Sequence, residues 1–328
     1  MMKKGVKKFA ASFFFALGVL LLILLIRKFG WGELFSTFRN LGWNLAYVMT
    51  VPLFWYVSQT LGWYFVLEET GQHVRLGQLL KIKLGGEAVN TLTPVSFIGG
   101  DPVRILLLTK TMPGTLSTAS VVLDRTMQSL AVIVLLAVGM LAAWLDLELP
   151  AVWKATFPAT TLALFGLIWF FIHRQKKGIF EFLSNFLSKL GIKKHRGENF
   201  QRHIEAVDQR ISAFYRHNPR RFAAVLFFHV AGRLAGVLEI YLVAWLMAIP
   251  LSLLGALYLA TLTVLVNVIF VFIPGSMGVM EGAYGALLLL LNLNPIEGVA
   301  IQLIRRLRSL FWIFIGLFVM LTYHKRKR

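Results

Sequence analysis

The chain has 328 residues, of which 57% are hydrophobic and 15% charged, and its formal net charge is +19. A soluble domain carries about 25% charged residues, so this composition excludes an ordinary soluble enzyme. The chain has no cysteine, which excludes disulfides and thiol chemistry, and its seven histidines show no metal-ligand spacing. We therefore expect no metal and no cofactor. Basic residues gather in the flanks and loops of apolar runs, which explains the charge without nucleic acid.

Apolar runs near ~20 residues match the thickness of a bilayer and predict an all-α polytopic membrane protein with about eight transmembrane helices. The predicted spans cover residues 9–26, 42–67, 116–145, 155–173, 222–248, 253–273, 276–293 and 296–322. The first span follows a basic N-terminus and lacks a small-residue cleavage site, so we interpret it as uncleaved. The 276–293 stretch is the weakest crossing, and a second re-entrant half-helix is the alternative.

Between the second and third predicted spans, residues 79–108 form two shorter apolar stretches that are separated at Pro94. Each has about a dozen residues, and at ~1.5 Å per residue neither can cross a hydrocarbon core of ~30 Å as a helix. A re-entrant hairpin is the natural prediction. Broken backbone of this kind is tolerated only where protein or a water-filled cavity shields it from lipid.

Residues 174–221 form the one sizeable polar segment, with twelve Lys/Arg against four acids. Helical periodicity in 179–190 and 200–214 predicts two amphipathic helices on the anionic cytoplasmic leaflet, and a solvated basic loop is the alternative. This segment would join an N-terminal half, 1–173, to a C-terminal half, 222–328, within one integral membrane domain. The basic termini and this segment predict that both termini are cytoplasmic.

Two polar segments that contain Pro and Gly, 85–101 and 267–282, interrupt the apolar sequence in the two halves. In each, a Pro is followed by Ser two residues on and by a carboxylate seven residues on. An offset of 180 residues aligns Pro94, Ser96, Asp101 and Arg125 with Pro274, Ser276, Glu281 and Arg305. Paired interruptions of this kind indicate a transporter site, so we predict an internal repeat. Chance combined with convergent re-entrant chemistry is the alternative, and whether the repeat is inverted or parallel stays open.

Eleven ionisable residues fall at membrane depth in this scheme. They are Glu87, Asp101, Arg104, Asp124, Arg125, Arg233, Glu239, Glu281, Arg305, Arg306 and Arg308. At ~3 kcal/mol each, leaving all of them unpaired in lipid would cost roughly 30 kcal/mol, so they must pair or line a wet cavity. The surplus of arginine suits an anionic phospholipid headgroup, because guanidinium binds phosphate through two hydrogen bonds. We expect Arg125 and Arg305 to contact the phosphate. The alternative is that they only neutralise Asp124 and Glu281.

The predicted lipid pathway combines the polar residues and glycines of the broken segments with charges on the helices that follow. It comprises Glu87, Asn90, Pro94, Gly99, Gly100, Asp101, Arg104, Asp124, Arg125, Asn267, Pro274, Gly275, Gly278, Glu281, Arg305 and Arg306. The alternative for the glycines is close helix packing, and for the charged residues it is a structural ion pair. No nucleophile with a base is visible, so we expect no enzyme, although a carboxylate acting as a base would keep lipid-modifying chemistry open.

These motifs resemble the lysylphosphatidylglycerol synthase transmembrane-region family, the flippase-like membrane domain of multiple peptide resistance factor. The resemblance covers roughly residues 10–320 and rests on five groups of residues. These are Gly86-Glu87-Ala88-Val89-Asn90, Thr93-Pro94, Gly99-Gly100-Asp101 with Arg104, Asp124-Arg125, and Pro274 to Gly282. Within the last group, Ser276 replaces a glycine of the family pattern.

The resemblance implies a lipid flippase-like transporter in the bacterial cytoplasmic membrane, whose partner is a phospholipid or another lipid headgroup. The chain ends at Arg328 without the aminoacyl-transferase domain of bifunctional members, so we expect a stand-alone form that does not synthesise the lipid. Two alternatives remain. One is an accessory subunit that presents lipid to a separate transferase, and the other is an integral-membrane lipid-modifying enzyme.

Overall fold

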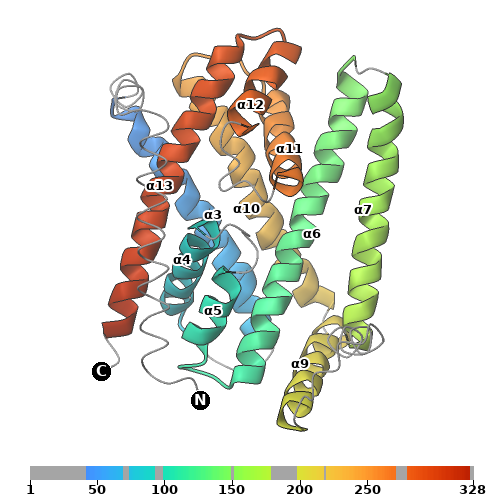
Figure 1. Cartoon of the computed structure of the whole chain (residues 1–328), viewed down its shortest axis with the longest axis vertical. Coiled ribbons are helices and arrows are strands. Elements are labelled where there is room, and N and C mark those ends of the chain that lie inside the picture. The colour runs from blue at the N-terminus through green and yellow to red at the C-terminus, as the bar shows by residue number, and fades with distance from the viewer. Residues whose placement is uncertain are drawn as a thin grey trace. The chain divides into compact units, whose positions relative to one another are not determined.

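The computed structural model of the chain describes residues 42–68, 74–92, 99–148, 151–178, 198–217, 219–270 and 279–325. Within these ranges every regular element is a helix (Figure 1). The helices are α3 (Asn44–Glu68), α4 (Leu76–Leu92), α5 (Gly100–Leu108), α6 (Gly114–Asp146), α7 (Ala151–Lys177), α9 (Glu198–His217), α10 (Pro219–Leu246), α11 (Leu253–Ile269), α12 (Val279–Leu290) and α13 (Pro295–Lys325). The prediction of an all-α membrane protein is confirmed.

Most predicted spans coincide with a helix. The spans predicted at 116–145 and 222–248 correspond to α6 and α10, which begin two or three residues earlier than predicted. By length and composition, three of the described helices are suited to crossing a membrane, namely α6, α10 and most of α7. The predicted first span, 9–26, lies outside the described residues, and the full number of spans stays a prediction.

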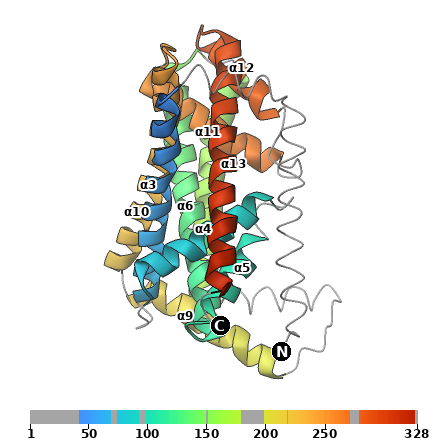
Figure 2. The same cartoon turned by 90° about the vertical axis from the view of Figure 1, so that its left-hand side faces the viewer.

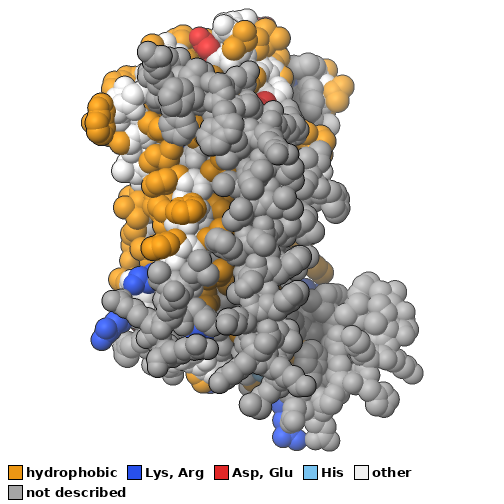
Figure 3. Space-filling view, turned by 60° about the vertical axis from the view of Figure 1, so that its left-hand side comes forward, with side chains coloured by type: hydrophobic (Ala, Val, Ile, Leu, Met, Phe, Trp, Pro, Cys, Tyr) orange, Lys and Arg blue, Asp and Glu red, His pale blue; other side chains and the backbone are white. Residues whose placement is uncertain are grey.

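The exposed surface of α7 is strongly apolar. Its candidate span, Lys154–Lys177, has a mean hydropathy of 1.8, and none of its most apolar stretch is buried within the protein. Leu162 is 72% exposed and Trp169 is 69% exposed. Large hydrophobic side chains also cover much of the described surface in Figure 3. Soluble monomers rarely expose apolar area on this scale, so lipid is the environment that these side chains fit.

Helix lengths follow the same order twice along the chain. A 17-residue helix, α4 or α11, is followed by a short helix of 9 or 12 residues, α5 or α12, and then by a long helix of 33 or 31 residues, α6 or α13. Residues 93–98 and 271–278, between each 17-residue helix and its short successor, lie outside the described residues. At ~1.5 Å per residue, α5 and α12 are each too short to cross a ~30 Å core alone. This order of lengths supports the predicted repeat and the half-helix reading of 276–293.

The described residues divide into two compact units, each built from separate stretches of chain. The first unit takes its residues from 1–56, 80–104 and 235–328, and the second from 57–79 and 105–234. The predicted halves, 1–173 and 222–328, follow chain order instead, and the single membrane domain stays a prediction.

In the first unit, α13 lies against α4 and α12 (Figure 2). Gly316 permits the contact with α4, because a Cβ there would lie 2.7 Å from the Cβ of Ala88. Next to this crossing, Tyr56, Leu84 and Trp312 form a buried apolar cluster. The indole Nε1 of Trp312 donates to the carbonyl oxygen of Met49 at 3.0 Å, so its one polar atom is satisfied.

In the second unit, α9 packs against α6 and α7. Its apolar face is buried, with Val207, Ile211 and Phe214 at 2% exposure or less. The amphipathic helix predicted at 200–214 is therefore present, but its apolar side packs against protein and leaves the charged side outward. Contact with an anionic leaflet, which stays a prediction, would then be electrostatic. The companion helix predicted at 179–190 lies outside the described residues.

Candidate functional site

Five charged side chains of the first unit come together where α13 meets α10 and α12. We call them the arginine cluster: Arg305, Arg306 and Arg308 on α13, Glu239 on α10 and Glu281 on α12. The arginine side chains are 14%, 11% and 19% exposed, and those of Glu239 and Glu281 are 4% and 10% exposed. The acids are thus more deeply buried than the arginines that they neutralise.

Both carboxylates are fully engaged. Glu239 Oε1 accepts from Arg305 Nε at 3.3 Å, and Glu239 Oε2 lies 3.1 Å from Nη1 of Arg308. Glu281 accepts two hydrogen bonds from Arg306, one from Nε and one from Nη2 at 3.1 Å. Such paired hydrogen bonds fix a guanidinium in direction as well as in charge.

Arg305 has further partners on α11 and α12. Its Nη1 donates to Thr263 Oγ1 at 3.4 Å and to the hydroxyl of Tyr284, and those two hydroxyls are 2.7 Å apart. The guanidinium carbon also lies 5.7 Å from the centre of the Tyr284 ring. Side chains from three helices therefore hold Arg305 in place.

Helix packing explains why Tyr284 is in reach of α13. A Cβ on Gly298 would lie 2.6 Å from the carbonyl oxygen of Tyr284, so only glycine allows α12 and α13 to approach this closely. Tyr284 follows Glu281 by three residues, which places both on one face of α12. One close crossing thus delivers a carboxylate and a hydroxyl to the arginines of α13.

The arginine cluster carries an excess of positive charge. Among the described residues of the cluster, three arginines face two carboxylates, which leaves one positive charge over. Two buried polar atoms, Arg308 Nε and Gln302 Oε1, have no hydrogen-bond partner within the described part of the chain. The cluster therefore keeps both charge and hydrogen-bonding capacity that an anionic group could use.

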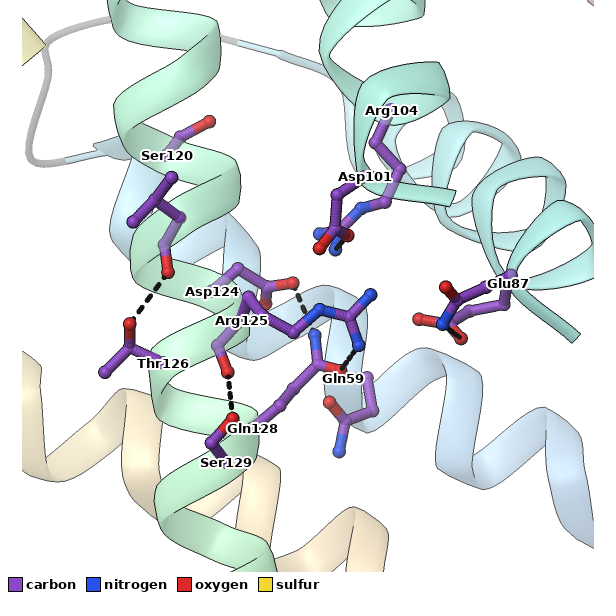
Figure 4. A network of polar contacts seen from close by, with 12 residues as sticks. Gln59, Glu87, Asp101, Arg104, Ser120, Asp124, Arg125, Thr126, Gln128 and Ser129 are labelled. Carbon is purple, nitrogen blue, oxygen red and sulfur yellow. Dashed lines mark hydrogen bonds and ion pairs between the residues drawn. The ribbon is translucent and has the colours of Figure 1, made fainter. Parts of the chain in front are cut away.

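A second group of predicted residues lies where α4 and α5 cross. Gly86 and Gly100 meet so closely that a Cβ on Gly100 would overlap the carbonyl oxygen of Gly86. Arg104, which is fully buried, lies against Gly86 and 3.2 Å from Asp101 in the first turn of α5 (Figure 4). The glycines therefore have a packing role, which agrees with the structural alternative for these positions.

On α4, Glu87 and Asn90 lie within one helical turn of each other. Asn90 Nδ2 donates to Glu87 Oε2 at 3.4 Å, and Glu87 is 9% exposed. The other carboxylate oxygen of Glu87 has no hydrogen-bond partner among the described residues. Its charge is therefore less well compensated than that of Glu281.

On α6, in the second unit, Asp124 and Arg125 are linked through Gln128. Gln128 Nε2 donates to Asp124 Oδ2 at 2.6 Å, and Gln128 Oε1 accepts from Arg125 at 3.4 Å (Figure 4). The other carboxylate oxygen of Asp124 lies 3.2 Å from Nε2 of His229 on α10. Asp124 is fully buried, whereas Arg125 is half-buried.

Other predicted pathway residues are less informative. Gly99 directly precedes α5, and Asn267 is exposed near the end of α11. The remaining four predicted positions lie outside the described residues: Pro94, Pro274, Gly275 and Gly278.

The structure also adds residues that the sequence did not single out. The sequence predicted Glu239 at membrane depth but not in the lipid pathway. In the structure, Glu239 and not Glu281 is the carboxylate that pairs with Arg305. Thr263 and Tyr284 carry no charge, so they were not among the ionisable residues predicted at membrane depth. His229 was considered only for metal-ligand spacing. Helical spacing from a predicted acid was the available signal, since Tyr284 lies three residues after Glu281.

Comparison with known proteins identifies the family. No curated protein and no solved structure matches the chain. The family described as Lysylphosphatidylglycerol synthase TM region matches residues 9–316, nearly the whole chain. The chain therefore belongs to the lysylphosphatidylglycerol synthase transmembrane-region family.

Proposed function

We propose that this protein translocates an anionic phospholipid across the bacterial cytoplasmic membrane. The family relates to membrane phospholipid, which supports this substrate class. The arginine cluster is the observation that carries the proposal. It combines one surplus positive charge with partly exposed guanidinium groups, in a chain whose surface fits lipid.

In this mechanism the two carboxylates hold the arginines in position, and the surplus charge attracts the lipid phosphate. Arg308 Nε has no hydrogen-bond partner among the described residues, and the Arg308 side chain is the most exposed of the three. Arg305, held by Glu239 and Tyr284, keeps the cluster in a fixed geometry. Guanidinium suits this task because it stays charged in lipid surroundings and can bind two phosphate oxygens at once.

A flip assay in proteoliposomes tests the proposal. Fluorescent NBD-labelled phosphatidylglycerol is placed in both leaflets, dithionite bleaches the outer one, and flipping exposes the rest. We expect Arg308→Lys to slow flipping about tenfold, because it keeps the charge but loses a charge-assisted hydrogen bond worth ~1.5–3 kcal/mol. Arg210→Lys, on the exposed side of α9, is the matched control and should leave the rate unchanged.

Two results distinguish the candidate functions, and a third tests the arginine cluster. Absence of flipping by the wild-type protein, with the probe still bound, would favour an accessory subunit that presents lipid. Appearance of a chemically changed lipid would favour an enzyme. Equal rates for Arg308→Lys and the wild-type protein would remove the arginine cluster from the mechanism.

A further inference from the structure

The second unit contains a buried polar group that the proposed function does not use. It joins His229 of α10 to Gln59 of α3 and Asp124 of α6, and all three residues are 0% exposed. His229 Nδ1 lies 2.5 Å from Gln59 Oε1, and Nε2 lies 3.2 Å from Asp124 Oδ1. Asp124 is ten residues into α6 and His229 is ten residues into α10, which places each ~15 Å from the N-terminal end of its helix.

The hydrogen bonds around the ring fix where its protons lie. Gln59 Nε2 donates to the backbone carbonyl of His229 at 3.3 Å, so the oxygen of that amide faces the ring. An amide oxygen only accepts, so His229 Nδ1 must carry a proton. In a neutral imidazole the other nitrogen, Nε2, would then be bare and 3.2 Å from a carboxylate oxygen, at a distance but not in the alignment of a hydrogen bond.

Nε2 and Asp124 Oδ1 are 3.2 Å apart, the distance of an ion pair, and the buried carboxylate favours a second proton on the ring through its negative charge. The surroundings favour an imidazolium beside a carboxylate. Gln59 accepts from the charged ring, and Gln128 donates to Asp124 at 2.6 Å. Both bonds stabilise the ionised forms.

Within the described part of the chain, charged groups near the ring lie on α6 and α10. α6 supplies Asp124 itself and also Arg125, which donates to Gln128. On α10, Arg233 lies one turn beyond His229. The neighbouring side chains of α3, Ser58 and Gln59, are uncharged. With the second proton on the ring, the positive imidazolium and the negative carboxylate cancel, so the His229–Asp124 pair is neutral as a whole.

We infer that the buried His229–Asp124 pair binds an exchangeable proton and that lipid translocation is coupled to its release and uptake. The coupling rests on the proposed function, whereas the proton site stands on the geometry alone. Release breaks the Nε2–H bond, passes the proton to water and leaves a neutral imidazole beside a carboxylate. The ion-pair attraction between His229 of α10 and Asp124 of α6 is then lost, so the proton changes the strength of the contact between these helices.

Protonation is measured directly by NMR of the whole protein labelled with ¹⁵N-histidine in detergent. The His229 signals are identified by their loss in His229→Gln. At pH 7 we expect both ring nitrogens of His229 to be protonated, and in Asp124→Asn we expect Nε2 to be bare, because the carboxylate that holds the proton is gone. A bare Nε2 in the wild-type protein at pH 7 would overturn the inference.

Coupling is measured by flipping of NBD-labelled phosphatidylglycerol with and without a pH gradient across the vesicle. We expect the gradient to change the wild-type rate severalfold and to have no effect on His229→Gln, whose amide is polar but cannot titrate. His173→Gln is the matched control, since His173 is an exposed histidine on α7, and it should respond like the wild-type protein.

The outcomes separate this inference from the proposed function. A wild-type flipping rate that does not change with the pH gradient would refute the coupling and leave the flippase proposal intact. No flipping at all would refute the proposed function and the coupling together, while the NMR measurement would still decide the proton site.

Discussion

Replacing Glu239 with Gln tests the arginine cluster most sharply, because this carboxylate neutralises two arginines at once. It is 4% exposed and lies 3.3 Å from Arg305 and 3.1 Å from Arg308. Removing one partner of a buried ion pair costs ~3–5 kcal/mol. Here the arginines are 14% and 19% exposed and water screens part of their charge, and the amide oxygen of Gln can still accept a bond. We therefore expect a loss of about 2–3 kcal/mol in stability.

The same change raises the surplus charge of the cluster from one to two. If this charge attracts lipid phosphate, Glu239→Gln should bind NBD-labelled phosphatidylglycerol more tightly per folded molecule, although it unfolds at a lower temperature. Thermal unfolding in detergent and fluorescence titration with the probe measure the two effects on one sample. Glu205→Gln, an exposed acid on α9, is the matched control and should change neither.

Two results would refute this reasoning. Unchanged thermal stability would mean that the ion pairs of Glu239 contribute nothing to the fold. Weaker binding of the anionic probe, despite the higher positive charge, would mean that the surplus charge does not attract lipid. The second result would count against the proposed site even if the fold were unaffected.

Three further predictions concern packing, pH and topology. Gly298→Ala should destabilise the protein by ~1–3 kcal/mol in thermal unfolding, because the new Cβ would lie 2.6 Å from the Tyr284 carbonyl oxygen. Gly282→Ala is the control and should be neutral or stabilising, because a Cβ there has nothing within 4 Å. Burial raises the pKa of Tyr215 on α9. The folded protein therefore holds the Tyr215 proton more tightly than the unfolded chain, so the contribution of Tyr215 to stability should be constant below about pH 10 and fall above it. In Tyr215→Phe this loss of stability at high pH should be smaller. Identical pH profiles for the variant and the wild-type protein would contradict the raised pKa of Tyr215. A single cysteine at residue 195 should resist an impermeant thiol reagent outside intact cells, and labelling there would overturn the cytoplasmic placement of 174–221.

Most of the fold could be predicted from the hydrophobic runs in the sequence. A bilayer demands apolar stretches of about 20 residues whatever their neighbours are, so α6 and α10 were predictable to within a few residues. The short elements were harder. α12 was predicted as a weak crossing over 276–293, with a half-helix as the alternative, because apolar content alone does not say where a helix begins after Pro and Gly.

The candidate site was predictable in composition but not in pairing. Sequence placed Glu281, Arg305 and Arg306 at membrane depth, because a charge there must be compensated whatever the fold. It did not say that Arg306 would take Glu281 and that Arg305 would take Glu239. Those pairs join α13 to α12 and to α10, so they depend on which faces the helices turn toward each other.

By itself, the sequence determined that this is a helical membrane protein with charged residues that must find partners in a low-dielectric interior. Those properties follow from transfer free energies of single residues, which do not depend on tertiary contacts. Only the tertiary structure decided the partners. The close crossing at Gly298 brings Tyr284 to Arg305, and the packing of α3, α6 and α10 encloses His229 with Asp124. Distances of about 3 Å between residues far apart in sequence come from side-chain packing, which no local pattern records.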